Sequence, residues 1–271
     1  MKVKRISLGF RELTLLMTLE KENRKIFTIN DAKRILKTSD ASVKNVLKRL
    51  VKKHRITRIK RGEYVLSPAK SGIEGFWAEH PFLVISKIIK QYYIGFWTAL
   101  NYWGMTEQIP RTVFIVALKQ RRSINYGNQK YQFIKFSQNK FFGYIKERVE
   151  DRFFNISSRE KTIADCLLFP KYCGGITEIT KAVWSSRKEL DWKELMKIIN
   201  LIKVDAAKRR LGYILEALKI KRDLQRKLLK KKFTGFRWLD PSSQKERFEY
   251  SKKWGLKVNV KKEQLLGWRG Y

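Results

Sequence analysis

The sequence predicts an α+β protein made of two domains, with a small and mostly helical domain at its N-terminus. The chain has 271 residues, of which 43% are hydrophobic, so it can bury more than one core. Apolar residues recur at helical spacing up to about residue 53, and strand-length apolar runs lie between residues 112 and 156. Helical spacing returns after residue 157. Such an order of helices, strands and helices is typical of α+β architecture.

The second feature is a large excess of positive charge. Lysine and arginine number 61 against 25 aspartate and glutamate, which gives a formal charge of +36. The first 70 residues alone hold 20 basic and 6 acidic residues. A compact chain with this charge repels itself, so we expect a polyanionic partner. Nucleic acid is the first candidate and an anionic membrane surface is the second.

Composition also argues against several other classes of protein. Two cysteines, Cys166 and Cys173, cannot make a disulfide framework or a four-cysteine metal site. His54 and His80 match no metal-ligand spacing, and the apolar run 94–105 is too short to cross a bilayer. No secretory signal follows the basic start. We therefore expect a cytoplasmic protein that has no metal, no cofactor and no catalytic residue, and that does not bind membranes.

Three helices are expected in the first 53 residues. The first covers residues 10–19, with an apolar face made of Phe10, Leu13, Leu16, Met17 and Leu19. The second covers residues 31–36 with Asn30 as its N-cap. The third begins at Thr38, Ser39 or Asp40 and runs to about residue 53. Its buried stripe is expected to consist of Val43, Val46, Leu47 and Leu50, which are spaced i, i+3, i+4 and i+7.

A basic hairpin follows the third helix. Residues 56–60 and 64–66 have strand composition, and Arg61-Gly62 lies between them as a turn. Three helices followed by a hairpin form the order of a winged helix-turn-helix. In that arrangement the third helix enters the major groove of DNA, and the hairpin lies beside the backbone.

The exposed face of the third helix and the hairpin supply the groups that duplex DNA requires. Cations neutralise phosphates, while amide, hydroxyl and guanidinium groups read base edges. The candidates for reading bases are Ser39, Ser42, Asn45 and Arg49. The candidates for phosphate contacts are Lys44, Lys48, Lys52, Arg58, Lys60 and Arg61. The alternative is a solvated basic helix on a protein-binding domain.

A change of composition after Pro68 predicts the domain boundary. We assign residues 1–68 to the DNA-binding domain, 69–75 to a linker and 76–271 to a second α+β domain. Aromatic residues cluster at its start: Phe76, Trp77, Phe82, Tyr92, Tyr93, Phe96, Trp97, Tyr102 and Trp103. They could stack on unpaired bases, but a buried helix from Ile94 to Tyr102 that ends at Gly104 is favoured.

The rest of the second domain is expected to contain strands and then a helical bundle. Residues 113–118 and 131–136 are predicted to form a hairpin that turns at residues 126–128, and a further strand pair is expected between 144 and 156. Ser157 and Glu160 predict a capping box for a helix to Leu168, and Asp191 and Glu194 predict another for residues 192–202. One long helix or a helix pair follows over residues 205–232.

The end of that helical stretch is strongly basic. Its cations Arg222, Arg226, Lys227, Lys230 and Lys231 could hold DNA phosphates or an acidic partner, or the helix could lie on a membrane surface. A solvated helix face in a lysine-rich chain is the alternative.

Four blocks occur in a fixed order in the second domain. An aromatic block at residues 93–110 precedes the predicted hairpin, and residues 158–165 open a helix with the pattern SREKTIAD. Residues 170–175 form a loop with a proline and two glycines, and residues 209–216 read RRLGYILE. Together these blocks resemble the AbiEi family, the antitoxins of type IV toxin–antitoxin (abortive infection) systems, in its aromatic block, ER-T-x-x-D helix start, P…GG loop and RLGYLLE helix. Lys161 is a departure from the family's helix start.

The resemblance implies a non-catalytic transcriptional repressor. It implies autoregulation of an operon through inverted repeats at the promoter, and opposition to a nucleotidyltransferase toxin. Two-fold repeats require two copies of the winged domain on the DNA. The chain is therefore expected to be either a homodimer before it binds or a monomer that dimerises on the DNA.

Two other classes of function stay open. A winged-helix nuclease would need carboxylates and a lysine around a divalent ion, and Asp240, Glu249 and Lys252, or Asp191 and Lys193, are the nearest candidates. Charge and aromatic content alone would also fit a non-specific DNA- or RNA-binding protein.

Overall fold

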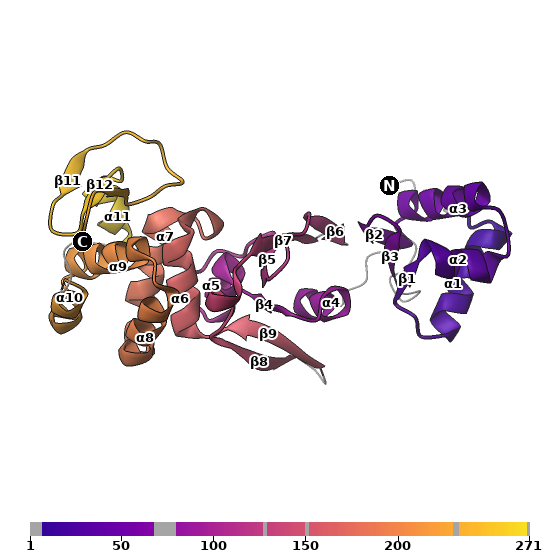
Figure 1. Ribbon diagram of the computed structural model, residues 1–271, viewed down its shortest axis with the longest axis horizontal. Coiled ribbons are helices and arrows are strands. Elements are labelled where there is room, and N and C mark those ends of the chain that lie inside the picture. The colour runs from indigo at the N-terminus through magenta and orange to yellow at the C-terminus, as the bar shows by residue number, and fades with distance from the viewer. Residues whose placement is uncertain (1–6, 68–79, 127–128, 150–151, 230–232, 270–271) are drawn as a thin grey trace.

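The computed structural model describes residues 7–67, 80–126, 129–149, 152–229 and 233–269. It confirms the α+β class, with helices and sheets along an elongated molecule (Figure 1). The helices α1, α2 and α3 lie at one end, a sheet lies in the middle, and α8, α9 and α10 lie at the other end (Figure 1). The predicted linker 69–75, Phe76 and Trp77 lie outside the described residues, so the boundaries at 68 and 76 stay a prediction.

The N-terminal portion (residues 7–67) consists of helices and short strands around one core. Its elements are α1 (Phe10–Lys21), β1 (Ile26–Thr28), α2 (Ile29–Leu36), α3 (Asp40–Lys52), β2 (Ile56–Lys60) and β3 (Glu63–Leu66). β3 lies between β1 and β2 and is antiparallel to both. The predicted third helix, its four buried residues and the hairpin are confirmed. β1 was not predicted, because three residues are too few to show an alternating pattern.

The buried face of α1 is not the predicted one. Phe10 is 85% exposed, and Leu13 and Met17 are exposed as well. The helix instead buries Leu15 and Glu12, together with Leu16 and Leu19 as expected. Apolar residues surround most of this helix, so spacing alone does not select a face. Packing against α2 and α3 selects it.

The helix starts in this portion depend on side-chain caps. The predicted N-cap Asn30 is wrong, because α2 begins two residues earlier, with Thr28 as its cap. Thr28 accepts a hydrogen bond from the Asp31 backbone, and Asp31 accepts one from the Thr28 backbone, which satisfies two amides at once. Ser39 caps α3, because its hydroxyl accepts a hydrogen bond from the Ser42 amide. Ser39 was one of the three predicted starting residues of this helix.

The central sheet has the strand order β6-β7-β5-β4-β9-β8 in the described residues. Its strands are β4 (Tyr92–Ile94), β5 (Thr112–Ala117), β6 (Ile124–Tyr126), β7 (Gln129–Lys135), β8 (Tyr144–Val149) and β9 (Arg152–Ser157), joined by the 3-10 helix η2 (Gln138–Lys140) between β7 and β8. The helices α4 (Pro81–Ile88) and α5 (Phe96–Tyr102) precede and follow β4. The predicted strand pair between 144 and 156 is confirmed as β8 and β9.

Two predictions about this sheet are wrong. β5 and β7 are parallel neighbours and not the two arms of a hairpin, because the short strand β6 reverses the chain and pairs with the outer edge of β7. β5 is a continuous apolar run because it is buried between β4 and β7. Ile94 belongs to β4 and not to the aromatic helix, which begins at Phe96. The expected burial of Tyr92, Tyr93 and Phe96 is confirmed.

Helices and a small sheet complete the chain. The helical elements are α6 (Arg159–Leu168), η3 (Pro170–Tyr172), α7 (Gly175–Ser185), α8 (Trp192–Ile202), α9 (Asp205–Ala217), α10 (Arg222–Leu228), α11 (Lys262–Leu266) and η4 (Gly267–Arg269). The small sheet has β12 (Leu256–Val258) between β10 (Arg237–Trp238) and β11 (Glu249–Ser251). The predicted cap Ser157 is wrong by one residue, since Ser158 accepts from the Lys161 amide. Asp191 caps α8 as predicted, but the reciprocal half of the predicted capping box is not formed, because the Asp191 amide donates to Glu160 and not to Glu194. Residues 205–228 form a helix pair.

Helix α9 holds the C-terminal segment through two buried arginines. Arg209 donates hydrogen bonds to the carbonyl oxygens of Thr234, Gly235 and Gly255. Arg210 donates to those of Leu167, Trp238 and Leu239. Gly212 lies against the ring of Trp254, where a Cβ would stand 1.9 Å from a ring carbon. The sequence block 209–216 is therefore explained by packing.

The described residues contain no helix that is both long enough and apolar enough to cross a membrane.

Candidate nucleic-acid interface

The outer face of α3 presents a row of polar and basic side chains. Asn45, Lys48 and Lys52 are spaced i, i+3 and i+7, so they lie along one side of the helix, and all three are exposed. The opposite side is buried through Val43, Val46, Leu47 and Leu50. Burial of that stripe fixes the rotation of the helix and leaves the polar row facing outward.

The structure brings α3 and the hairpin together in one groove. Lys44 and Lys48 of α3 line a hollow of about 420 Å³ together with Arg58 and Arg61 of the hairpin. The hollow has an apolar floor that includes Leu47 and Tyr64. Four of the predicted phosphate-contacting residues thus lie on a single surface. None of the described residues that line this surface is acidic.

Two other predicted residues are held from the side of α1. Arg11 donates a 2.7 Å hydrogen bond to the Ser42 hydroxyl. The Arg49 Nε donates to a carboxylate oxygen of Glu12 at 2.9 Å, and Lys53 pairs with the other oxygen at 2.5 Å. Arg49 nevertheless remains largely exposed. Its position is therefore fixed by an ion pair, while part of its guanidinium faces solvent.

Glu12 is the central group of that ion-pair cluster. It is 2% exposed and also accepts a hydrogen bond from the Gly9 amide. Burial acts to raise the pKa of this carboxyl, but the Lys53 and Gly9 hydrogen bonds, the Lys53 charge and the Arg49 hydrogen bond outweigh it. The pKa of Glu12 consequently lies below its usual value of 4.5. The carboxylate is charged at neutral pH and orients Arg49 of α3 and Lys53 at the C-cap of that helix.

The other predicted residues are placed as follows. Ser39 is used as the cap of α3 and is exposed. The side chain of Lys60 lies outside the described residues. Arg222, Arg226 and Lys227 are exposed on α10, at the end of the molecule opposite to α3 (Figure 1). Lys230 and Lys231 lie outside the described residues, so the second predicted patch is separate from the first.

Sequence reasoning missed two kinds of residue near this surface. Arg11 and Glu12 position side chains of α3, and Glu12 was detectable as the third residue of a helix that begins after Gly9. Lys119, Arg121 and Arg122 lie close to the hairpin across a second hollow. The basic run KQRR at residues 119–122 is visible in the sequence, but only the fold places it beside residues 58–61.

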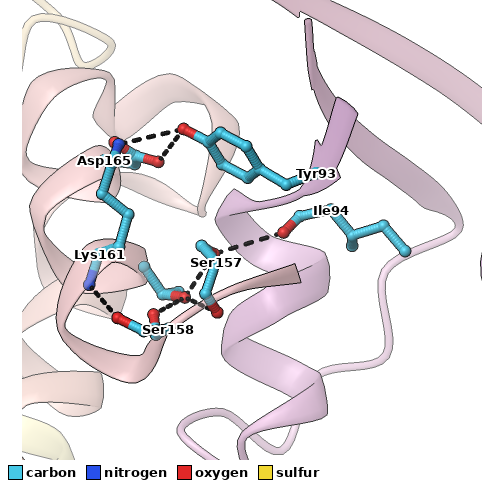
Figure 2. A network of polar contacts seen from close by, with 7 residues as sticks. Tyr93, Ile94, Ser157, Ser158, Lys161 and Asp165 are labelled. Atoms are coloured by element: carbon cyan, nitrogen blue, oxygen red, sulfur yellow. Dashed lines mark hydrogen bonds and ion pairs between the residues drawn. The ribbon is translucent and has the colours of Figure 1, made fainter. Parts of the chain in front are cut away.

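A buried polar network lies in the second part of the chain and is shown in Figure 2. Lys161 pairs with Asp165 one turn along α6 and donates a 3.0 Å hydrogen bond to the Tyr93 hydroxyl, which donates to Asp165 at 2.8 Å. Rings of Tyr93, Phe136 and Phe142 lie 5.1–5.3 Å from the Lys161 ammonium. Burial raises the pKa of Tyr93 well above its usual value and lowers that of Lys161.

This network joins α6 to the central sheet. Ser157 at the end of β9 donates to the Ile94 carbonyl oxygen of β4, as Figure 2 also shows. Lys161 and Asp165 are fully buried, and neither lines a described hollow. Full burial of the Lys161–Asp165 ion pair favours a structural role over chemistry.

The carboxylates considered for a nuclease are dispersed. Asp240 is buried, and its oxygens accept from the Ile176 amide and from Ser242. Glu249 lies on β11 near the Tyr213 hydroxyl, and Asp191 is the cap of α8. Within the described ranges, no three histidine, cysteine, aspartate or glutamate residues are grouped as metal ligands would be. The geometry therefore gives Asp240 a capping role at the start of α7.

Comparison with known proteins identifies a similar fold. The chain is similar to the crystal structure of the RV2827C protein from Mycobacterium tuberculosis, with a TM-score of 0.64 over 98% of this chain and 96% of that chain. The two sequences are 11% identical, so the likeness concerns the fold alone. The sequence matches no protein-family model and no curated protein.

Proposed function

We propose that this chain is a sequence-specific DNA-binding protein that represses transcription, with its N-terminal portion acting as a winged helix-turn-helix. The groove shared by α3 and the hairpin carries this proposal, because Lys44, Lys48, Arg58 and Arg61 line one surface. A helix and a hairpin with cations on one face can follow the major groove and the adjoining backbone together. Asn45 on the exposed row has the amide that can pair with adenine.

The resemblance to the AbiEi family supports a more specific role. In that role the chain is the cytoplasmic antitoxin of a type IV toxin–antitoxin system, represses its own operon at inverted repeats and opposes a nucleotidyltransferase toxin. The block 209–216 is occupied with packing through Arg209, Arg210 and Gly212. The resemblance in that block therefore concerns the fold of this part, and the residues that oppose the toxin are still to be assigned.

A reporter gene fused to the DNA upstream of the chain's own gene tests the repressor role. We expect the wild-type chain to lower expression of the reporter, and the double variant Asn45→Ala/Lys48→Ala to lose this effect. The matched control is Asn200→Ala/Lys193→Ala, which removes the same two residue types from the exposed face of α8. Repression that persists in the α3 variant, or is lost equally in the control, would refute the proposal.

The antitoxin role has a separate test. The neighbouring gene is expressed with and without this chain, and growth is followed. Rescue of growth by the wild-type chain supports the role. A neighbouring gene product that is harmless alone, or toxic regardless of this chain, would leave a repressor without an antitoxin function.

A further inference from the structure

A second hollow lies between the hairpin and the central sheet. It has a volume of about 980 Å³ and is lined on one side by residues of α3, β2 and the hairpin turn. The other side is the loop of residues 119–123, which joins β5 to β6, together with the start of β6. β2 belongs to the N-terminal sheet and β6 belongs to the central sheet. These two strands are in contact, so the hollow lies where the two sheets meet.

The lining of this hollow is strongly cationic. Its charged residues are Arg58, Arg61, Lys119, Arg121 and Arg122, and none of the described residues that line it is acidic. Within the described part of the chain, Lys119, Arg121 and Arg122 form no ion pair, and Lys119 and Arg122 are exposed. Like charges of this density repel one another unless an anion lies between them.

Apolar packing holds the loop beside the hairpin. Ile59 of β2 is buried in the same cluster as Ile124 of β6 and Phe133 of β7. All three residues also line the hollow. The cationic rim therefore stands on a packed base, which fixes the spacing between the two sets of charges before any ligand binds.

The second hollow continues the groove of the candidate interface. Val51, Arg58 and Arg61 line both hollows. A single basic surface thus runs from Lys44 and Lys48, across the hairpin, to the loop of residues 119–122. A ligand that follows this surface has to be extended and anionic along its length.

We propose that Lys119, Arg121 and Arg122 form a second phosphate-binding site, which contacts the backbone of duplex DNA that flanks the sequence facing α3. The inference rests on the proposed DNA-binding function and extends it to the second part of the chain. Arginine binds phosphate oxygens through two parallel hydrogen bonds. Among the described residues that line the hollow, the aromatic rings are the buried Phe133 and the exposed imidazole of His54, so no exposed Phe, Tyr or Trp ring is available for stacking. Stacking rings are typical of single-strand binders, so a duplex backbone is the better fit.

The test compares the wild-type chain with the triple variant Lys119→Ala/Arg121→Ala/Arg122→Ala. Dissociation constants are measured at 50 and 200 mM salt on two duplexes from the upstream region, one limited to the sequence bound by α3 and one with flanking base pairs. A scrambled duplex and a single-stranded RNA serve as competitors. The control variant Lys193→Ala/Lys197→Ala/Lys203→Ala removes three lysines that line a hollow on the far helices. Circular dichroism verifies that both variants are folded.

We expect the wild-type chain to bind the flanked duplex more tightly than the short one, and the triple variant to lose that difference. Each lost phosphate contact lowers the slope of log affinity against log salt concentration by about 0.9. The loss of affinity between 50 and 200 mM salt is therefore expected to be roughly 10- to 40-fold smaller in the variant, if two or three contacts are lost. The ratio of specific to scrambled affinity is expected to stay the same, because phosphate contacts carry no sequence information.

A triple variant with the wild-type salt slope and flank preference would overturn the inference. Single-stranded RNA that displaces the duplex from the wild-type chain but not from the triple variant would also overturn it. Failure of the proposed function has a different signature. Equal wild-type affinity for upstream and scrambled DNA would refute specific repression, while a reduced slope in the triple variant would still support the phosphate site.

Discussion

At the scale of single residues, Glu12 shows how a buried charge can serve an exposed surface. It is almost fully buried, yet its partners Arg49 and Lys53 lie on the helix that carries the candidate interface and at the C-cap of that helix, respectively. The carboxylate therefore connects the core of the N-terminal portion to the orientation of α3. A buried acid on the first turn of α1 also explains why that helix packs with Leu15 inward and Phe10 outward.

Replacing this carboxylate gives a prediction with a defined pH dependence. Glu12→Gln is expected to lower the free energy of unfolding at pH 7 by about 1–3 kcal/mol, because charge-assisted hydrogen bonds are lost. The folded-state pKa lies below 4.5, so the stabilisation is present above the unfolded-state pKa and is lost as pH falls through the folded-state value. Urea unfolding at pH 7, 5 and 3 measures this difference.

The exposed Glu107→Gln variant serves as the control. A constant stability difference between the wild type and Glu12→Gln at all three pH values would contradict the role assigned to the charge.

A second residue-scale prediction concerns the contact between α9 and the C-terminal segment. In Gly212→Ala the new methyl group would overlap the Trp254 ring, so the ring or the helix has to shift. We expect a loss of about 3 kcal/mol in the free energy of unfolding, as for severe overpacking. Gly267→Ala is the matched control, because no atom lies within 4 Å of its Cβ position. Equal denaturation midpoints for the two variants would show that the contact is not as close as described.

At the scale of elements, the face of α3 divides into two sets of side chains with different roles. Asn45→Ala is expected to change which bases are preferred, with about 1–3 kcal/mol less discrimination at one position. Lys44→Ala, in the groove beside the hairpin, is expected to weaken binding to all sequences alike and to lower the salt slope by about 1. Binding of both variants to a library of duplexes at two salt concentrations separates these effects. Identical changes in the two variants would contradict the division.

The elements that could be predicted from the sequence are those whose signal is local. The stripe of α3 and the turn at residues 61–62 depend on neighbours within a few positions and were predicted, and the cap was narrowed to three neighbouring residues that include Ser39. The pairing of β5 with β7 was not found, because it depends on where the short strand β6 lies. The rotation of α1 was also missed, because contacts with other helices determine it.

The candidate site was predictable to a similar degree. Its residues on α3 and the hairpin follow from helical spacing and charge, and the structure places Lys44, Lys48, Arg58 and Arg61 together. Glu12 and the loop of residues 119–122 were missed, since their contact with this surface joins segments far apart in the sequence. No pattern within either segment indicates the other.

At the scale of the whole molecule, positive charge is found at both ends of an elongated chain. The basic surface formed by α3, the hairpin and residues 119–122 is continuous, whereas α10 lies at the opposite end (Figure 1). Two separated basic regions can serve two different partners. This arrangement fits a protein that binds DNA through one end and leaves the other end available.

This separation gives a prediction about α10. Arg222→Ala/Arg226→Ala is expected to leave the affinity for a short upstream duplex within about twofold of the wild type, because a surface charge beyond the Debye length of roughly 10 Å contributes little to binding. Fluorescence anisotropy at 0.1 M salt measures this affinity. A decrease as large as that caused by Lys44→Ala would place α10 on the DNA and contradict the separation.

The decisive experiment is a binding titration of the intact chain with the DNA upstream of its own gene and with a scrambled duplex of equal length, at 50 and 200 mM salt. Sequence-specific recognition through α3 predicts at least a hundredfold preference for the upstream duplex at both salt concentrations. It also predicts that Asn45→Ala reduces this preference and that Asn200→Ala does not. Equal affinity for the two duplexes, with a steep salt slope and no effect of Asn45→Ala, would mean that the charge binds nucleic acid without reading its sequence.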